Sequence, residues 1–231
     1  MCVEILTQKA KARILIVDDH PLVRDGLMRL INSQPDLVAI GEAGTAHEAM
    51  AHVEQNQPDL AILDLRLKHG DGLELIRTLK AQEPHLLLLV LSQYDEPIYV
   101  ERALRAGASG YIDKQQAANR LLEAIRTVLA GEIYLTRGMA AVLLSRGIGH
   151  AQSAGPRKEI EQLTNRELHV FSLIGAGIGT RAVAAALHVS VKTVETHREN
   201  IKHKLNLKGA AELVHAASQW ASGQAILSGA A

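Results

Sequence analysis

Aromatic residues, cysteine and long apolar runs are all scarce in this sequence of 231 residues. Aromatic residues make up 3% of the chain, which argues against the stacking platform that binds single-stranded nucleic acids. The only cysteine, Cys2, excludes an internal disulfide and favours a reducing compartment.

The longest purely aliphatic run covers residues 86–91, whereas a membrane-spanning helix needs about 20 apolar residues. The first 12 residues lack the basic region and the long apolar stretch of a secretory signal. We therefore expect a cytoplasmic protein with no membrane partner.

Net charge is absent overall but differs between the two halves. Lysine and arginine number 25, as do aspartate and glutamate, yet the residues up to Pro156 carry a net charge of −3 and those from Arg157 onward carry +3. A basic C-terminal half is suited to approach a polyanion. The apolar fraction of 47% is ample for packed cores.

Short apolar runs alternate with stretches of helical periodicity through the first part of the chain. Five runs are typical of buried strands: 14–17, 37–43, 60–63, 86–91 and 109–112. Five β-α units predict an α/β fold with a parallel sheet that helices cover on both faces. In such sheets ligands bind beyond the carboxyl ends of the strands.

The remaining chain is helical in pattern, apart from a stretch rich in glycine, serine, alanine and proline at 147–156 that we interpret as a tether. The last helix is expected over about Lys208 to Trp220. The predicted organisation is a flexible N-terminus, a first domain, a linker with a helix over about 136–146, a small all-α domain and a flexible tail, at 1–12, 13–131, 132–160, 161–222 and 223–231.

Chemically distinctive residues follow four of the predicted strands: Asp18 with Asp19, Asp64, Ser92 and Lys114. A parallel sheet brings them to one edge, where three carboxylates repel one another unless a divalent cation lies between them. Oxygen ligands without histidine or cysteine at ligand spacing favour Mg²⁺. A simpler alternative is that Asp18 or Asp19 only caps a helix that opens at Pro21.

Residues 13–130 resemble the receiver domain of two-component response regulators, which has a flavodoxin-like (βα)5 fold. The resemblance is carried by ILIVDDHPLVRDGL at 14–27, AILDLRLKHGDGLEL at 61–75, LVLS at 89–92 and GASGYIDK at 107–114.

The resemblance implies that a sensor histidine kinase delivers a phosphoryl group to Asp64. It also implies that Mg²⁺ is held by Asp18, Asp19, Asp64 and the backbone carbonyl of Arg66. Such a protein is a phosphoacceptor and not an enzyme, apart from the chemistry of its own phosphorylation and dephosphorylation.

The same resemblance assigns a switch to residues around the acceptor. Lys114 pairs with the phosphoryl group, and the Ser92 hydroxyl hydrogen-bonds one of its oxygens. Tyr111 then moves from a solvent-facing to a buried rotamer, which changes the surface of the fourth helix and fifth strand.

Two positions depart from the usual receiver pattern. Lys68 stands where proline is usual, which predicts a more mobile loop and an extra cation near the site. Gln93 follows Ser92 where many receivers have a small residue, and we expect it to shield the phosphoryl group partly.

Residues 163–205 resemble the helix-turn-helix domain of regulators of the NarL/LuxR (FixJ) type. Thr164 and Glu167 form a capping-box pattern that opens a helix. A helix over about 180–187 and a short turn precede Ser190, which is expected to cap the second helix of the motif. The apolar stripe of that second helix is Val194, Ile201 and Leu205.

The opposite face of this second helix is expected to meet the major groove of double-stranded promoter DNA. Glu195 and Glu199 are candidates to accept hydrogen bonds from cytosine amino groups. The predicted DNA-binding residues are Lys192, Thr193, Glu195, Thr196, Arg198, Glu199 and Lys202, of which the three basic ones are candidates for phosphate contacts. For any one of these charges the alternative is a solvated helix face.

The last helix is expected to expose Leu213, Val214, Ala217 and Trp220 at helical spacing, although the core of a small domain could absorb some of them. The resemblance implies that Leu213, Val214 and Ala217 pair two copies into a homodimer when the protein is phosphorylated.

These features together predict a transcription regulator controlled by phosphorylation of Asp64. One alternative is a regulator with a degenerate receiver that acts without phosphorylation. Another, an aspartyl-phosphate phosphohydrolase, is disfavoured because such enzymes have a D-x-D pattern and position 66 is Arg66. A ligand-sensing regulator is disfavoured by the acidic cluster.

Overall fold

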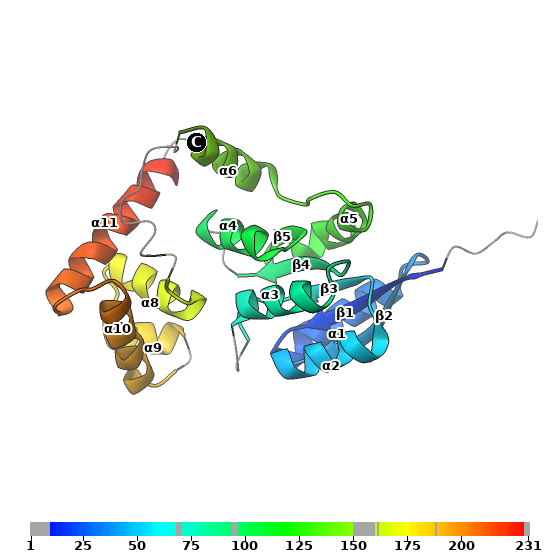
Figure 1. The fold of residues 1–231 in the computed structure, drawn as a ribbon, viewed down its shortest axis with the longest axis horizontal. Coiled ribbons are helices and arrows are strands. Elements are labelled where there is room, and N and C mark those ends of the chain that lie inside the picture. The colour runs from blue at the N-terminus through cyan, green and yellow to red at the C-terminus, as the bar shows by residue number, and fades with distance from the viewer. Residues whose placement is uncertain are drawn as a thin grey trace, which may run out of the picture. The chain divides into compact units, whose positions relative to one another are not determined.

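The computed structural model describes residues 10–67, 71–93, 97–149, 160, 162–187 and 189–228. The chain divides into two compact units, residues 1–143 and 144–231 (Figure 1). Lys68 and residues 150–156 of the expected tether lie outside the described residues.

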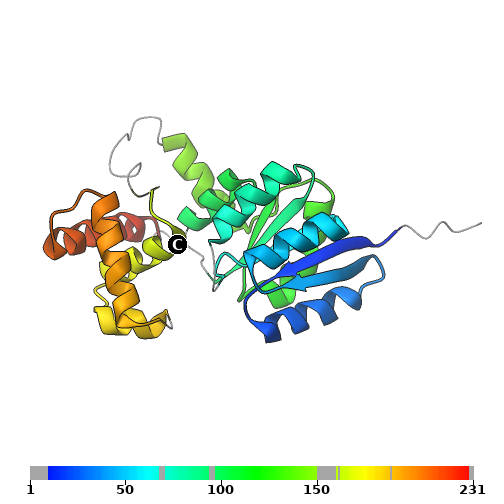
Figure 2. The same ribbon diagram turned by 60° about the horizontal axis from the view of Figure 1, so that its bottom comes forward.

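A five-stranded parallel sheet forms the centre of the first unit, and its strand order is β2-β1-β3-β4-β5 (Figure 2). The strands are β1 (Ala12–Val17), β2 (Leu37–Ala43), β3 (Leu60–Leu63), β4 (Leu87–Ser92) and β5 (Gly110–Asp113). This sheet confirms the predicted flavodoxin-like α/β fold. The strand order reverses between β1 and β3, which is where doubly wound folds bind their ligands.

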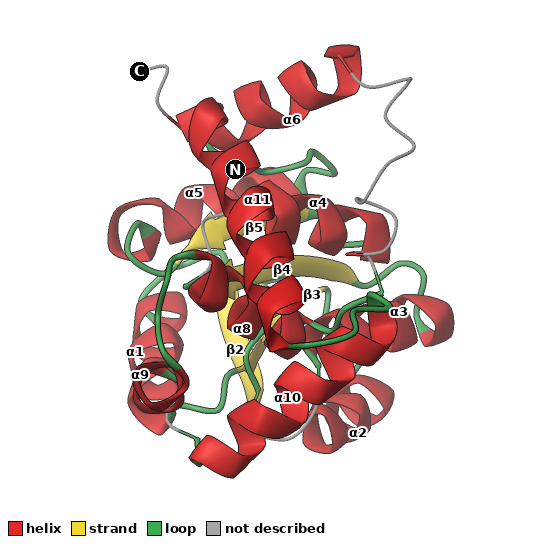
Figure 3. Cartoon of the chain, turned by 90° about the vertical axis from the view of Figure 1, so that its left-hand side faces the viewer, coloured by secondary structure: helices red, strands yellow, loops and turns green. Residues whose placement is uncertain are grey.

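Five helices cover the two faces of the sheet: α1 (Pro21–Asn32), α2 (Ala46–Asn56), α3 (Gly72–Gln82), α4 (Pro97–Ala106) and α5 (Ala117–Leu129). Helices α1 and α5 pack on the face that carries Ile14, Ile16 and Ile62, and α2, α3 and α4 lie on the other face (Figure 3). Every residue of β3 is buried, as expected of a strand that is covered on both sides.

The segment after α5 runs alongside β5. The amide of Tyr111 donates to the carbonyl of Tyr134 at 2.9 Å, and the amide of Tyr134 donates to the carbonyl of Ser109 at 3.2 Å. Tyr134 is buried within the core cluster of the sheet. The start of the linker therefore covers part of the outer edge of β5, which would otherwise offer unpaired backbone groups. Helix α6 (Arg137–Gly149) follows and ends three residues later than predicted.

The second unit contains α8 (Asn165–Gly175), α9 (Thr180–Ala186), α10 (Val191–Lys204) and α11 (Ala210–Ser228). The structure confirms the capping box of Thr164 and Glu167 at the start of α8, and it confirms that Ser190 caps α10. A small all-α domain was predicted and is observed.

Helix α11 ends at Ser228, whereas the sequence analysis placed its end near Trp220. The prediction was wrong because the chain contains no proline between Trp220 and Ser228, and its single glycine there weakens a helix without ending it.

Candidate functional site

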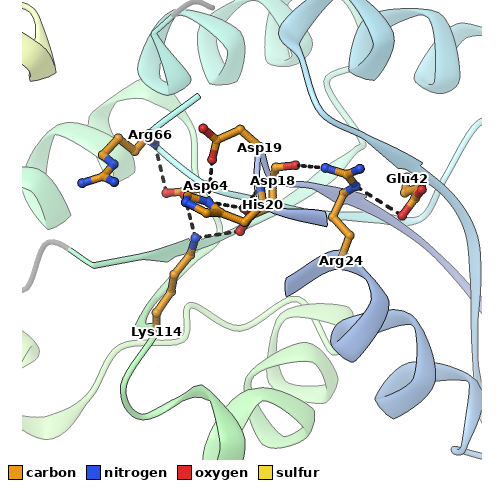
Figure 4. Close-up of polar contacts among 8 residues, drawn as sticks. All are labelled: Asp18, Asp19, His20, Arg24, Glu42, Asp64, Arg66 and Lys114. Atoms are coloured by element: carbon orange, nitrogen blue, oxygen red, sulfur yellow. Dashed lines mark hydrogen bonds and ion pairs between the residues drawn. The ribbon is translucent and has the colours of Figure 1, made fainter. Parts of the chain in front are cut away.

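The acidic residues at the ends of β1 and β3 lie together at the carboxyl edge of the sheet (Figure 4). Asp18 and Asp64 are buried, and their exposed fractions are 2% and 3%. The Lys114 ammonium bridges them, with its Nζ 2.6 Å from Asp18 Oδ2 and 2.7 Å from Asp64 Oδ2. The sequence predicts that these three residues converge, and in the structure Lys114 contacts both acids directly.

Strand pairing places the three side chains. The amide of Asp64 donates to the carbonyl of Val17 at 2.9 Å, which ties the end of β3 to the end of β1. The amide of Lys114 donates to the carbonyl of Ser92 at 2.8 Å, so β4 holds the residue that follows β5. Adjacent strands thus deliver the acids and the lysine to one point.

His20 also belongs to this cluster, although the sequence analysis did not include it. Its Nδ1 lies 2.7 Å from Asp19 Oδ1 and 3.1 Å from Asp18 Oδ1. Its backbone amide donates to Asp18 Oδ1 at 2.8 Å. The sequence signal for His20 was its position directly after two acids. That position does not give the direction of its side chain, which depends on the turn that follows the strand.

Burial and the charge of Lys114 act in opposite directions on the pKa of Asp64. Burial raises the pKa of Asp64, the Lys114 charge and its hydrogen bond offset part of that rise, and the nearby Asp18 charge adds to it. Burial alone would lower the pKa of Lys114, but the carboxylates of Asp64 and Asp18 outweigh it and raise that pKa. Lys114 is therefore a fixed positive charge beside the acids.

The donor set fits a divalent cation. The 2.7 Å contact between His20 and Asp19 is not aligned as a hydrogen bond, so Asp19 Oδ1 is a buried oxygen without a hydrogen-bond donor. An oxygen in that condition is stabilised by a bound cation. Asp18, Asp19, His20 and Asp64 each offer one ligand atom, and these atoms lie within 4.8 Å of one another. The site could therefore bind Mg²⁺.

Arg66 and Arg24 border the cluster in different ways. The amide of Arg66 donates to Asp64 Oδ1 at 3.0 Å, while its side chain points away from the acids (Figure 4). Arg24, which the sequence analysis missed, donates from a guanidinium nitrogen to the carbonyl of Asp18 at 2.6 Å and from Nε to Glu42 at 3.2 Å. Arg24 thereby anchors the loop that carries Asp18 and Asp19.

Helix α10 of the second unit presents the second group of predicted site residues. Its stripe of Val194, Ile201 and Leu205 is buried, as predicted. Four of the predicted residues are exposed, namely Lys192, Glu195, Thr196 and Glu199, and Thr193 is half-buried.

The basic residues of that face are not equivalent. The Arg198 side chain is only 16% exposed; it donates to Thr180 Oγ1 at 3.4 Å and lies 3.7 Å from a carboxylate oxygen of Glu195. Lys202 pairs with Glu199 at 2.9 Å. Within the described part of the chain, Lys192 makes no ion pair.

Two families match the two units. Residues 14–126 match the response regulator receiver domain, and residues 161–217 match the bacterial regulatory proteins of the luxR family. The chain is 39% identical over 206 residues to the oxygen regulatory protein NreC of Staphylococcus carnosus, covering 87% of this chain and 94% of the relative. It is 38% identical over 204 residues to the transcriptional activator protein ExaE of Pseudomonas putida, covering 88% and 94%.

The chain is a two-component response regulator of the LuxR family. A solved LuxR-family response regulator from Aurantimonas sp. SI85-9A1 is 32% identical, with a TM-score of 0.57, covering 60% of this chain and 99% of that one. RcsB of Salmonella enterica serovar Typhimurium, solved on promoter rprA with the phosphomimetic BeF3⁻, shares the fold at 23% identity and a TM-score of 0.56, covering 90% and 98%.

Ser92 and Tyr111, the predicted switch residues of the regulator, are both buried, and their switch role stays a prediction. Ser92 ends β4 and is fully buried. Tyr111 is also fully buried, which is the inward end of the movement that the resemblance implies, and its solvent-facing position stays a prediction. Gln93 is exposed, and its shielding role stays a prediction as well.

The predicted exposure of the regulator's dimerisation residues is wrong for two of the three. Leu213 and Ala217 are fully buried, because the small domain uses them to pack α11 against α8, while Val214 is 45% exposed. Trp220 is half-buried, and its ring centroid lies 5.8 Å from that of Phe171 on α8. The apolar period of α11 reflects this core more than a surface for a second copy.

Within the described residues, no helix of the regulator has the length and apolar character needed to cross a bilayer.

Proposed function

We propose that phosphorylation of Asp64 by a sensor histidine kinase controls binding of this regulator to promoter DNA. The observation that carries the proposal is the buried Asp64 carboxylate held 2.7 Å from Lys114 beside two further acids, in a chain that also has a LuxR-type DNA-binding domain. The proposed domains are a receiver at 13–131, a linker at 132–160 and the DNA-binding domain at 161–222.

The chemistry asks mainly for alignment and charge neutralisation. A carboxylate oxygen of Asp64 forms a bond to phosphorus while the bond from phosphorus to the donor breaks, and the donor leaves with that electron pair. Mg²⁺, when bound by Asp18, Asp19, Asp64 and the Arg66 carbonyl, supplies positive charge to the phosphoryl oxygens. Lys114 remains positively charged and pairs with the phosphoryl group.

The response begins with the added charge. A phosphoryl oxygen accepts a hydrogen bond from the Ser92 hydroxyl, and Tyr111 takes or keeps its buried position. Because the Tyr111 amide bonds the carbonyl of Tyr134, a shift of β5 acts directly on the start of the linker. This contact is a physical route from the receiver toward the DNA-binding domain.

The relatives and structures support a homodimeric regulator of transcription. One relative is named a transcriptional activator, and RcsB has been solved as dimers bound to DNA. We propose that the exposed face of α10 enters the major groove and that Val214 is the remaining predicted residue available to a second copy. Because DNA is the proposed partner, we place the regulator in the cytoplasm.

Acetyl phosphate tests the proposal with the full-length protein. We expect wild type to gain one phosphoryl group in Mg²⁺ but not in excess chelator, as measured by intact mass. We expect its affinity for DNA sequences selected from a random pool to rise about tenfold or more, which is within the usual range of allosteric coupling.

Two outcomes contradict the proposal in different ways. Modification without any change in DNA affinity would separate the receiver from DNA control. DNA binding by a protein that takes up no phosphoryl group would favour the alternative, a regulator with a degenerate receiver.

Salt dependence separates the predicted phosphate contacts on α10. We expect Lys192→Gln to reduce the slope of log affinity against log salt by about 1, because exposed Lys192 has no ion-pair partner among the described residues. Arg198→Gln should weaken binding and leave that slope nearly unchanged, because Arg198 is engaged with Thr180 and Glu195. Equal losses of slope in filter-binding titrations would contradict this distinction.

A further inference from the structure

A nitrogen atom lies inside the cluster that the receiver resemblance describes with oxygen ligands alone. His20 Nδ1 faces the Oδ1 atoms of Asp18 and Asp19, at 3.1 and 2.7 Å. It belongs to the group of four potential ligand atoms within 4.8 Å of one another. Figure 4 shows its ring among the three acids.

Lys114 and His20 contact different oxygens of the Asp18 carboxylate. Lys114 contacts the Oδ2 atoms of Asp18 and Asp64, whereas His20 contacts the Oδ1 atoms of Asp18 and Asp19. Asp19 Oδ1 is buried without a hydrogen bond, and the Asp19 side chain is 9% exposed. The side that faces His20 therefore has an oxygen that still lacks a donor or a cation.

The backbone of His20 is held in place independently of its ring, and the ring Nδ1 is hydrogen-bonded to Asp18 Oδ1 at 3.1 Å. The His20 amide donates to Asp18 Oδ1 at 2.8 Å, and His20 is the N-cap residue of α1 without a side-chain capping bond. Its side chain is 45% exposed, so an ion from solvent can reach Nδ1. A metal at Nδ1 would replace the hydrogen bond between that nitrogen and Asp18 Oδ1, and it would leave the start of α1 undisturbed.

We propose that His20 Nδ1 is an additional metal ligand, which gives this site a preference for divalent transition ions such as Mn²⁺ and Co²⁺ over Mg²⁺. Imidazole nitrogen binds transition ions well, whereas Mg²⁺ takes oxygen ligands almost exclusively. Binding requires the neutral ring with its proton on Nε2, so that the Nδ1 lone pair points toward the metal. The inference rests on the metal site of the proposed function and extends it to the identity of the ion.

Two variants test whether His20 is a metal ligand or only a hydrogen-bond partner of the acids. His20→Asn keeps the backbone amide that bonds Asp18 and removes the imidazole. His85→Asn is the matched control, because exposed His85 precedes β4 at the opposite edge of the sheet.

Binding is measured on the full chain without a phosphodonor, by electron paramagnetic resonance of free Mn²⁺ and by Mg²⁺ competition. We expect His20→Asn to weaken Mn²⁺ binding about tenfold or more and Mg²⁺ binding less than about threefold, because only the transition ion depends on nitrogen. We expect His85→Asn to match wild type for both ions.

Spin-echo modulation of bound Mn²⁺ gives a direct readout of nitrogen ligation. A ¹⁴N modulation present in wild type and in His85→Asn but absent in His20→Asn supports the inference. Equal weakening of both ions, or wild-type Mn²⁺ without ¹⁴N modulation, overturns it and leaves His20 as a hydrogen-bond partner of the acids. Neither outcome depends on phosphorylation, so a protein that gains a phosphoryl group in Mg²⁺ yet fails this test retains its proposed function.

Discussion

Replacing Asp64 with asparagine should abolish phosphoryl transfer from acetyl phosphate, so that the intact mass of the variant does not change. An amide has no anionic oxygen to attack phosphorus, and the other acids of the cluster are engaged differently: Asp18 with Lys114 and His20, and Asp19 with His20. The variant should also lose the gain in DNA affinity that acetyl phosphate produces in wild type. Both readouts come from the same samples, by mass spectrometry and by DNA titration.

Asp59→Asn is the matched control, because Asp59 precedes β3 at its other end and bonds the amide of Arg13 at 2.7 Å. It should be modified like wild type. A phosphoryl group that persists in Asp64→Asn would place the acceptor elsewhere and contradict the assignment.

The Asp64→Asn variant should also lose part of the pH dependence of folding stability. Burial raises the pKa of Asp64, so its stabilising contribution is present at low pH and is lost as pH rises through the folded-state pKa. The free energy of unfolding of wild type relative to Asp64→Asn should therefore fall as pH rises above the ordinary pKa of an aspartate. Urea titrations in chelator, across about pH 4 to pH 7, measure that difference. A difference that stays constant over this range would contradict a raised pKa.

Gly175→Ala should destabilise the DNA-binding domain by about 3 kcal/mol, despite the better helix propensity of alanine. A Cβ at Gly175 would lie 2.4 Å from the carbonyl oxygen of Ala217 and 2.9 Å from its carbonyl carbon. These atoms are backbone, so α8 and α11 must move apart. The preference of alanine for helices offsets only about 1 kcal/mol of that cost. Thermal and urea unfolding of the full chain measure the loss.

Gly209→Ala is the control within the same unit, because nothing lies within 4 Å of the added carbon. As a change just before α11 it should cost less than about 1 kcal/mol. Equal stability of Gly175→Ala and wild type would mean that the two helices separate without cost, contrary to the close contact observed. Gly175 makes its close contact with α11 and not with the exposed face of α10. The Gly175→Ala variant should therefore lose DNA binding only to the extent that the domain unfolds.

The strands and the acids at their ends were predictable because local chemistry decides them. A run such as 60–63 has no polar residue and is too short for a helix, and the structure makes it a strand with both faces buried. Once five β-α units imply a parallel sheet, the positions after each strand must meet at one edge. The contact of Asp64, Asp18 and Lys114 follows from that rule.

The errors about side-chain positions fall where the partner of a side chain lies far along the chain. The apolar spacing of Leu213 and Ala217 is the same whether they face a second copy or α8, and only the packing of α8 against α11 decides that they are buried. The ring direction of His20 and the anchoring of Asp18 by Arg24 depend on the turn after β1 and on the position of α1.

The sequence by itself determined the fold class, the motif at the strand ends and the family, because these depend on periodicity and on residues adjacent along the chain. Only the tertiary structure decided that Arg198 of α10 contacts Thr180 of α9, that Tyr134 pairs with β5, and that His20 lies near Asp64 of another strand. These features depend on distances between elements. The physical reason is that hydrogen bonds and close packing act over a few ångströms, whereas sequence spacing does not give the distance between atoms on different elements.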